Sequence, residues 1–105
     1  ILLLESNHDI EMLKIGPYPH WLKMRILGDT GHLSNEKAGE VIAAMAEKGT
    51  RYFLLGHLSK ENNIPELAYR TVCNALAQKN VHTGKDVFLD VLRRDRAGRV
   101  ICMDM

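Results

Sequence analysis

The sequence predicts an α/β fold in which parallel strands alternate with helices. Two short apolar runs, 1–4 and 51–55, have the length and composition of buried strands. The stretch between them carries apolar residues at helical spacing, so a helical crossover joins the two strands. Strands joined by such a crossover are parallel when they share a sheet. At 105 residues, the chain is one domain at most.

The first strand and the two helices after it are predicted from apolar runs and turn residues. Residues 1–4 are continuously apolar, which favours a fully buried parallel strand with Glu5 at its carboxyl end. A short helix capped by Asp9 or Asn7 follows. A second helix covers about 20–27, beyond a turn rich in Gly and Pro.

The clearest helix of the chain lies in the crossover. Ser34 or Asn35 caps it, Gly49 ends it, and apolar residues recur within it at i, i+3, i+4, i+7 and i+8. This apolar face should pack on the sheet. A last helix begins near Pro65, with Asn63 as its predicted N-cap.

The end of the chain has the pattern of a β-hairpin. Residues 86–94 alternate between apolar and polar, and a turn leads into a second strand over 99–103. Four arginines gather around this turn, which indicates a solvated hairpin end more than a site for a polyanion. They are Arg93, Arg94, Arg96 and Arg99.

Composition limits the classes of protein to which the chain can belong. Hydrophobic residues make up 46% and charged residues 26%, and the net charge of +1 gives no footprint of nucleic-acid binding by itself. Cys73 and Cys102 form no CxxC pair, so a reduced, cytoplasmic setting is expected. No apolar stretch approaches the ~18 residues of a membrane span. The chain opens on an apolar run without Met, so we expect 1–105 to be one partial domain of a larger protein.

Three polar side chains are candidates for a site at the carboxyl edge of the sheet. Glu5 and His57 each follow a strand, and parallel strands end at the same edge, where α/β sheets bind ligands. Topology permits His32 to join them from the loop before the crossover helix but does not require it. A carboxylate bonded to an imidazole suits a general acid. A lone histidine after a strand is, however, more often a loop hydrogen-bonder, and no HxH or HxxxH pair offers a self-sufficient metal site.

Four motifs resemble one family of hydrolases. They are LESNHD (4–9), GPYP (16–19), GHLSNE (31–36) and LGHLSKENN (55–63). In this order and at these intervals they look like the carboxyl-terminal half of metallo-β-lactamase-fold hydrolases of the YycJ/WalJ type, which are relatives of RNase Z and of the cyclic phosphodiesterase PhnP. The resemblance covers residues 1 to about 76, and the closing hairpin is also in the expected place.

The resemblance implies an αββα phosphodiesterase, most plausibly a nuclease acting on DNA or RNA, with two divalent metal ions (Zn or Mn) and a metal-bound hydroxide as nucleophile. His57 would be the last metal ligand, and Glu5 with His32 would be the catalytic pair that assists the leaving group. Three side chains of the loop before the last helix would bind substrate phosphate: Ser59, Asn62 and Asn63.

The departures from the family pattern limit what the chain can do alone. The family's HxHxDH cluster, a further histidine and a bridging aspartate lie upstream in full-length proteins, and nothing in this sequence replaces them. We therefore expect a fragment that is inactive, retains no metal, needs the missing amino-terminal half and self-associates through the face it leaves open. Two alternatives stay open: a small α/β interaction module with structural histidines, and a same-fold hydrolase of a non-nucleic ester or thioester.

Overall fold

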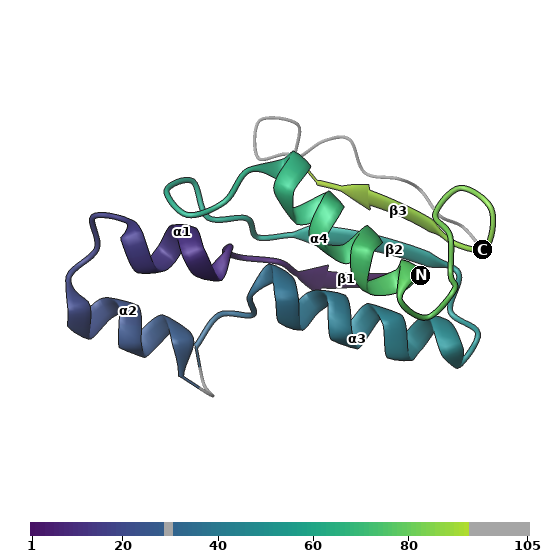
Figure 1. Ribbon diagram of the computed structural model, residues 1–105, viewed down its shortest axis with the longest axis horizontal. Coiled ribbons are helices and arrows are strands. Elements are labelled where there is room, and N and C mark those ends of the chain that lie inside the picture. The colour runs from purple at the N-terminus through teal and green to yellow at the C-terminus, as the bar shows by residue number, and fades with distance from the viewer. Residues whose placement is uncertain (29–30, 93–105) are drawn as a thin grey trace.

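A computed structural model describes residues 1–28 and 31–92 of the chain. The elements are β1 (Leu2–Glu5), α1 (Ile10–Ile15), α2 (His20–Leu27), α3 (Asn35–Glu47), β2 (Tyr52–Gly56), α4 (Pro65–Ala77) and β3 (Phe88–Val91). Over these residues the strands form one parallel sheet in the order β1-β2-β3 (Figure 1). The α/β class, with a parallel strand pair and crossover helices, is therefore confirmed. Within the described ranges, no helix has both the length and the apolarity to cross a membrane.

The core lies between the sheet and the two long helices, α3 and α4. Because strand order follows chain order, both crossovers run in the same direction and place these helices on the same face of the sheet. Phe53 and Leu55 of β2 are buried on this face at 2% and 0% exposure. They share one cluster with Ile42 of α3 and Val72 of α4. The apolar stripes predicted for the two helices are thus the surfaces that cover the sheet.

The opposite face of the sheet carries exposed apolar side chains. Leu3 is 58% and Phe88 53% exposed, and the ring of Phe88 stacks on Tyr52 with centroids 5.3 Å apart. Leu2 and Leu4 pack against the core instead. The expectation of a fully buried first strand is therefore wrong, because alternate residues of a strand point to opposite faces and the long helices cover one of them.

Two of the alternative helix caps are now decided. The carboxylate of Asp9 accepts the N–H of Met12 at 3.0 Å, so Asp9 and not Asn7 caps α1. The hydroxyl of Ser34 accepts the N–H of Lys37 at 3.0 Å and caps α3. Helix α2 has the predicted bounds. These caps satisfy backbone donors that a helix start leaves free.

The start of α4 differs from the prediction in one residue. Its N-cap is Ile64, which makes no side-chain capping bond, and Pro65 is its first residue. Asn63 was the expected cap, but its amide turns inward to other partners. A buried polar network has therefore displaced a local capping bond at this position.

The described residues include only the first strand of the predicted terminal hairpin. That strand is β3, which is shorter than the expected 86–94 and pairs in parallel with β2. Val87 and Leu89 are buried, and Val91 packs against the core, as the alternating pattern predicts. The expected second strand, 99–103, and the four arginines near the turn lie outside the described residues.

Candidate active site

The carboxyl ends of β1 and β2 bring two of the predicted site residues side by side. Glu5 is in register with Gly56, the residue before His57. His57 adopts a left-handed backbone conformation, with φ of 57°, which side chains other than glycine seldom take. This turn ends β2 abruptly and leads the chain across the edge of the sheet.

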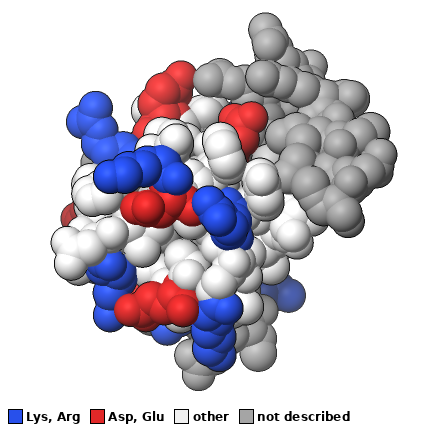
Figure 2. All heavy atoms as spheres, turned by 90° about the vertical axis from the view of Figure 1, so that its right-hand side faces the viewer, with Lys and Arg blue, Asp and Glu red and all other residues white. Residues whose placement is uncertain are grey.

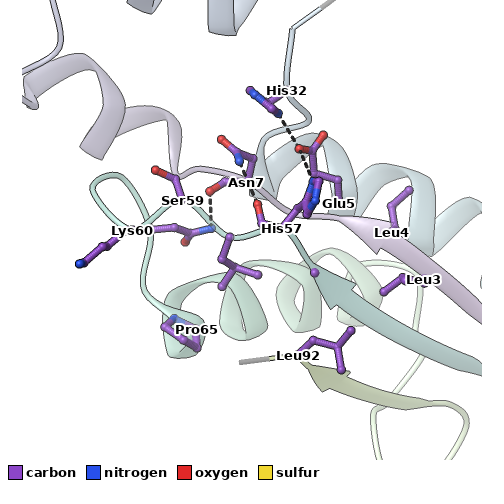
Figure 3. A pocket seen from close by; sticks show the side chains of 13 residues that line it. Leu3, Leu4, Glu5, Asn7, His32, His57, Ser59, Lys60, Pro65 and Leu92 are labelled. Carbon is purple, nitrogen blue, oxygen red and sulfur yellow. Dashed lines mark hydrogen bonds and ion pairs between the residues drawn. The ribbon is translucent and has the colours of Figure 1, made fainter. Parts of the chain in front are cut away.

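The carboxylate of Glu5 connects the three predicted residues. Its Oε2 lies 2.6 Å from Nδ1 of His32 and 3.6 Å from Nδ1 of His57 (Figure 3). Its Oε1 accepts the N–H of Leu33 at 3.0 Å. We call Glu5, His32 and His57 the edge trio. With a proton on Nδ1, His32 donates to the carboxylate, and its Nε2 is left to take part in proton transfer.

Hydrogen bonding keeps the Glu5 carboxyl ionised. Burial alone would raise the pKa of Glu5, but the bond from the Leu33 N–H and the contacts with His32 and His57 outweigh it and hold the pKa below its ordinary value. An ionised carboxylate stabilises a protonated imidazole beside it. The trio therefore has the geometry of a carboxylate that orients an imidazole through a hydrogen bond.

Asn7 holds the unusual backbone of His57 in place. Its side-chain N–H₂ donates to the backbone carbonyl of His57 at 2.8 Å, and its backbone carbonyl accepts the N–H of Ser59 at 2.6 Å. Both bonds tie the segment after β1 to the segment after β2. Sequence analysis gave Asn7 at most a role as a helix cap, because a contact across 50 positions leaves no local pattern.

A buried network of side chains lies beneath the trio. Asn35 accepts the Ser6 hydroxyl at 2.5 Å and the Asn63 amide at 2.9 Å, and it donates to Asn63 at 2.8 Å. Asn63 also donates to the carbonyl of Ser6 at 2.9 Å. Ser6 and Asn35 are fully buried and Asn63 is 6% exposed. This buried network joins the three segments that carry the trio: the end of β1, the start of α3 and the approach to α4.

A groove of about 1160 Å³ opens beside the trio. Asn7, Ser59 and Asn63 line its polar side together with the trio, and Leu3 is among its apolar lining residues. Lys60 also lines it, and in Figure 3 its side chain extends away from the trio. Sequence analysis missed Lys60, although a lysine three positions after His57 was a visible signal for phosphate contact.

The structure separates the three residues predicted to bind substrate. Ser59 lines the groove, and its hydroxyl accepts the N–H of Asn62 at 3.2 Å. Asn63 also lines the groove, but its side-chain amide is committed to the buried network. Asn62 is 1% exposed. Substrate binding by Asn62 and Asn63 stays an untested prediction, and their burial argues against it. Their visible function is to shape the loop.

The donor set of the described residues fits part of a metal site. Among residues 1–28 and 31–92, no group of three or more His, Cys, Asp or Glu side chains is arranged to hold a metal ion. The His57 side chain is 82% exposed and could offer a ring nitrogen. Catalytic zinc takes about three protein ligands. The remaining ligands of a metal at His57 would therefore have to come from outside the described residues.

The fold and this edge define a class: an α/β protein with a carboxylate and two imidazoles at the carboxyl ends of parallel strands, beside an open groove. Comparison with known proteins makes the class more specific. The exodeoxyribonuclease WalJ of Streptococcus pneumoniae, from strains D39 and R6, is 51% identical over 84 residues, which are 80% of this chain and 31% of the relative. The exodeoxyribonuclease YycJ of Bacillus anthracis is 43% identical over 83 residues, 79% of this chain and 31% of the relative.

The matched part of the chain belongs to the WalJ/YycJ family of exodeoxyribonucleases, which confirms the resemblance found in the sequence. The chain spans about a third of the length of these curated relatives. No protein-family model matches the chain, and no solved structure matches it.

Proposed function

We propose that the chain is part of a metal-dependent phosphodiesterase that hydrolyses DNA and has the metallo-β-lactamase fold. The observation that carries the proposal is the Glu5 carboxylate set between two imidazole nitrogens, at 2.6 and 3.6 Å, in a chain whose relatives are exodeoxyribonucleases. The αββα fold has helices on one face of each sheet and sheets packed together. A sheet with one covered face and an apolar uncovered face is consistent with half of it.

In this proposal the edge trio divides two tasks. Protonated His32 gives the proton on Nε2 to the leaving oxygen, and ionised Glu5 stabilises the imidazolium before transfer and fixes the Nδ1 tautomer afterwards. His57 would hold one of two divalent ions, Zn or Mn, which when bound supply a water of lowered pKa and offset phosphate charge. Asn7 keeps His57 oriented through its backbone carbonyl.

A chimera tests the proposal. The segment of the pneumococcal WalJ that matches this chain would be replaced by the corresponding 84 residues of the chain. We expect the chimera to degrade DNA in the presence of metal, and the same chimera with Glu5→Gln to be slower. A folded, metal-loaded chimera that cleaves a thioester and leaves DNA and bis(p-nitrophenyl) phosphate intact would refute the proposal.

The uncovered sheet face supports a proposal about the partner of the 105-residue chain. Ile1 and Leu3 are 58% exposed, and Phe88 53%. In the proposed fold this face meets the amino-terminal half, which the relatives' greater length can supply. Without that half we expect the chain to bind no metal tightly, to be inactive and to self-associate through this face. Sedimentation should show oligomers that Leu3→Lys reduces; a monomer at every concentration would contradict this.

A further inference from the structure

Helix α2 presents a face of side chains that the site described above does not use. No residue of α2 is buried. Trp21 is 65% and Met24 54% exposed, and Arg25 follows Trp21 by one helical turn. We call Trp21, Met24 and Arg25 the α2 face. Helical spacing puts an exposed aromatic ring and a guanidinium on the same side of α2, and exposed apolar groups rimmed by charge indicate a binding surface.

The charge of helix α2 itself has one sign, whereas the neighbouring α1 carries both Glu11 and Lys14. Helix α2 carries Lys23 and Arg25 and no acidic residue. The ammonium of Lys23 donates to the carbonyl of Lys14 at 2.6 Å and fastens α2 to α1. Arg25 and the exposed Lys14 side chain therefore remain as the cations for a ligand. By contrast, the opposite end of the molecule shows blue and red side chains interspersed (Figure 2).

The α2 face lies at the same end of the sheet as the edge trio. The strands point toward the end where α1 and α2 lie (Figure 1). Five peptide links connect Leu27 to His32, and an extended chain of that length spans at most about 17 Å. Trp21 is six positions before Leu27, which adds about 9 Å along a helix. Together these lengths put the face within about 26 Å of His32, a distance that a short single strand of DNA can bridge.

We infer that the α2 face binds a single-stranded segment of DNA and holds it toward the edge trio, with a base stacked on Trp21 and a phosphate on Arg25. The inference rests on the proposed function and deepens it by naming the form of the substrate. A single strand fits because an aromatic ring can stack on an unpaired base, whereas paired bases are already stacked. The excess of positive charge on α2 fits a polyanion better than an apolar protein surface.

Trp21 reports on its own contact because it is the single tryptophan of the chain. We would titrate the 105-residue chain with a twelve-nucleotide oligo-dT at low salt and record tryptophan emission together with the anisotropy of a labelled oligonucleotide. Stacking should quench the emission in a saturable way, at the same midpoint as the anisotropy change. A trinucleotide of dT should bind more weakly, since it makes fewer phosphate contacts.

Substitutions on the α2 face are compared with control substitutions of the same kind on α4. Trp21→Leu should weaken binding about 5- to 100-fold, as loss of one stacked base does. Arg25→Gln should lower the slope of log K against log salt by about 0.7. Tyr69→Leu and Arg70→Gln alter an exposed aromatic residue and an arginine on α4 and should change neither quantity.

Three outcomes would overturn the inference. In the first, the oligonucleotide binds but leaves Trp21 emission unchanged and binds the variants like the parent chain. In the second, no oligonucleotide binds at low salt while circular dichroism shows folded protein. In the third, Trp21 emission still shifts with protein concentration alone in Leu3→Lys, the variant that reduces association through the sheet face. That result would make the α2 face an interface between copies. The proposed function is judged separately by DNA hydrolysis in the chimera, so either can fail without the other.

Discussion

The side chains above the carboxyl edge of the sheet and those beneath it differ in exposure and in hydrogen bonding. In the edge trio, the side chains of His32 and His57 are 54% and 82% exposed. In the buried network, Ser6 and Asn35 are fully buried and bonded to each other. The comparison teaches that the side chains of the edge trio can face solvent in defined positions because the buried network holds the segments that carry them. Substitutions in the two layers should therefore have different kinds of effect.

The largest effects should come from the trio, and they should be on function. In the chimera with WalJ, His32→Ala should lower turnover about 100- to 10,000-fold, as loss of a general acid does, and should leave metal content unchanged. His57→Ala should lower metal content. Turnover and bound metal would be measured on the same preparations, with His82→Ala, on the loop after α4, as control. Equal metal loss in both variants would contradict the division of roles.

Substitutions in the buried network should lower the stability of the fold. Asn35→Ala leaves the Ser6 hydroxyl and part of the Asn63 amide without a partner in the interior. We expect a loss of about 2–3 kcal/mol in the free energy of unfolding, measured by urea denaturation. Asn74→Ala, an exposed asparagine of α4, should change it by less than about 0.5 kcal/mol. A similar small change for both would mean that the network does not hold the segments together.

Patterns within the sequence predicted the elements and the edge at which the trio meets. The apolar runs and helical periodicity fixed the strands and helices, since those signals are local. Parallel strands then required Glu5 and His57 to end at the same edge. Their approach to His32 could not be derived in this way, because the loop before α3 could have taken several paths. The bond from the Leu33 N–H to Glu5 shows what selects the path that it takes.

The errors of prediction share one physical cause. Asn63 was expected to cap α4, and it lies instead in contact with Asn35 and Ser6, far away in the sequence. Leu3 was expected to be buried, and its exposure depends on which face the helices cover. Each outcome is decided by tertiary neighbours. A local pattern carries no information on them.

The backbone of His57, a member of the edge trio, makes a smaller effect measurable. A left-handed conformation costs about 1–2 kcal/mol for a residue with a Cβ and little for glycine. His57→Gly should therefore raise the free energy of unfolding by about 1 kcal/mol while removing the imidazole. Asn80→Gly, at a second left-handed position, should gain less because asparagine tolerates this conformation. Destabilisation by His57→Gly would show that the imidazole contacts outweigh the backbone strain.

The smallest effect on stability should come from His8. This histidine is buried, whereas His32 is exposed. His8 is 1% exposed, and burial, followed by the charge of His32, lowers its pKa from the ordinary value of 6.5. His8 has the lowered pKa in the folded chain and the ordinary pKa in the unfolded chain. At a pH between these two values, the folded chain binds fewer protons than the unfolded chain. The stability from neutral His8 is therefore complete above pH 6.5 and is lost as the pH falls through the lower, folded-state pKa.

Urea midpoints at pH 7.5 and 5.5 measure this loss. The difference between them should shrink in His8→Gln, which carries no titrating group, and should persist in His20→Gln, because His20 is exposed on α2. If His8→Gln proves too unstable to fold, an NMR titration of the His8 ring in the parent chain gives the same answer. A midpoint of titration at or above 6.5 would show that burial does not keep this imidazole neutral.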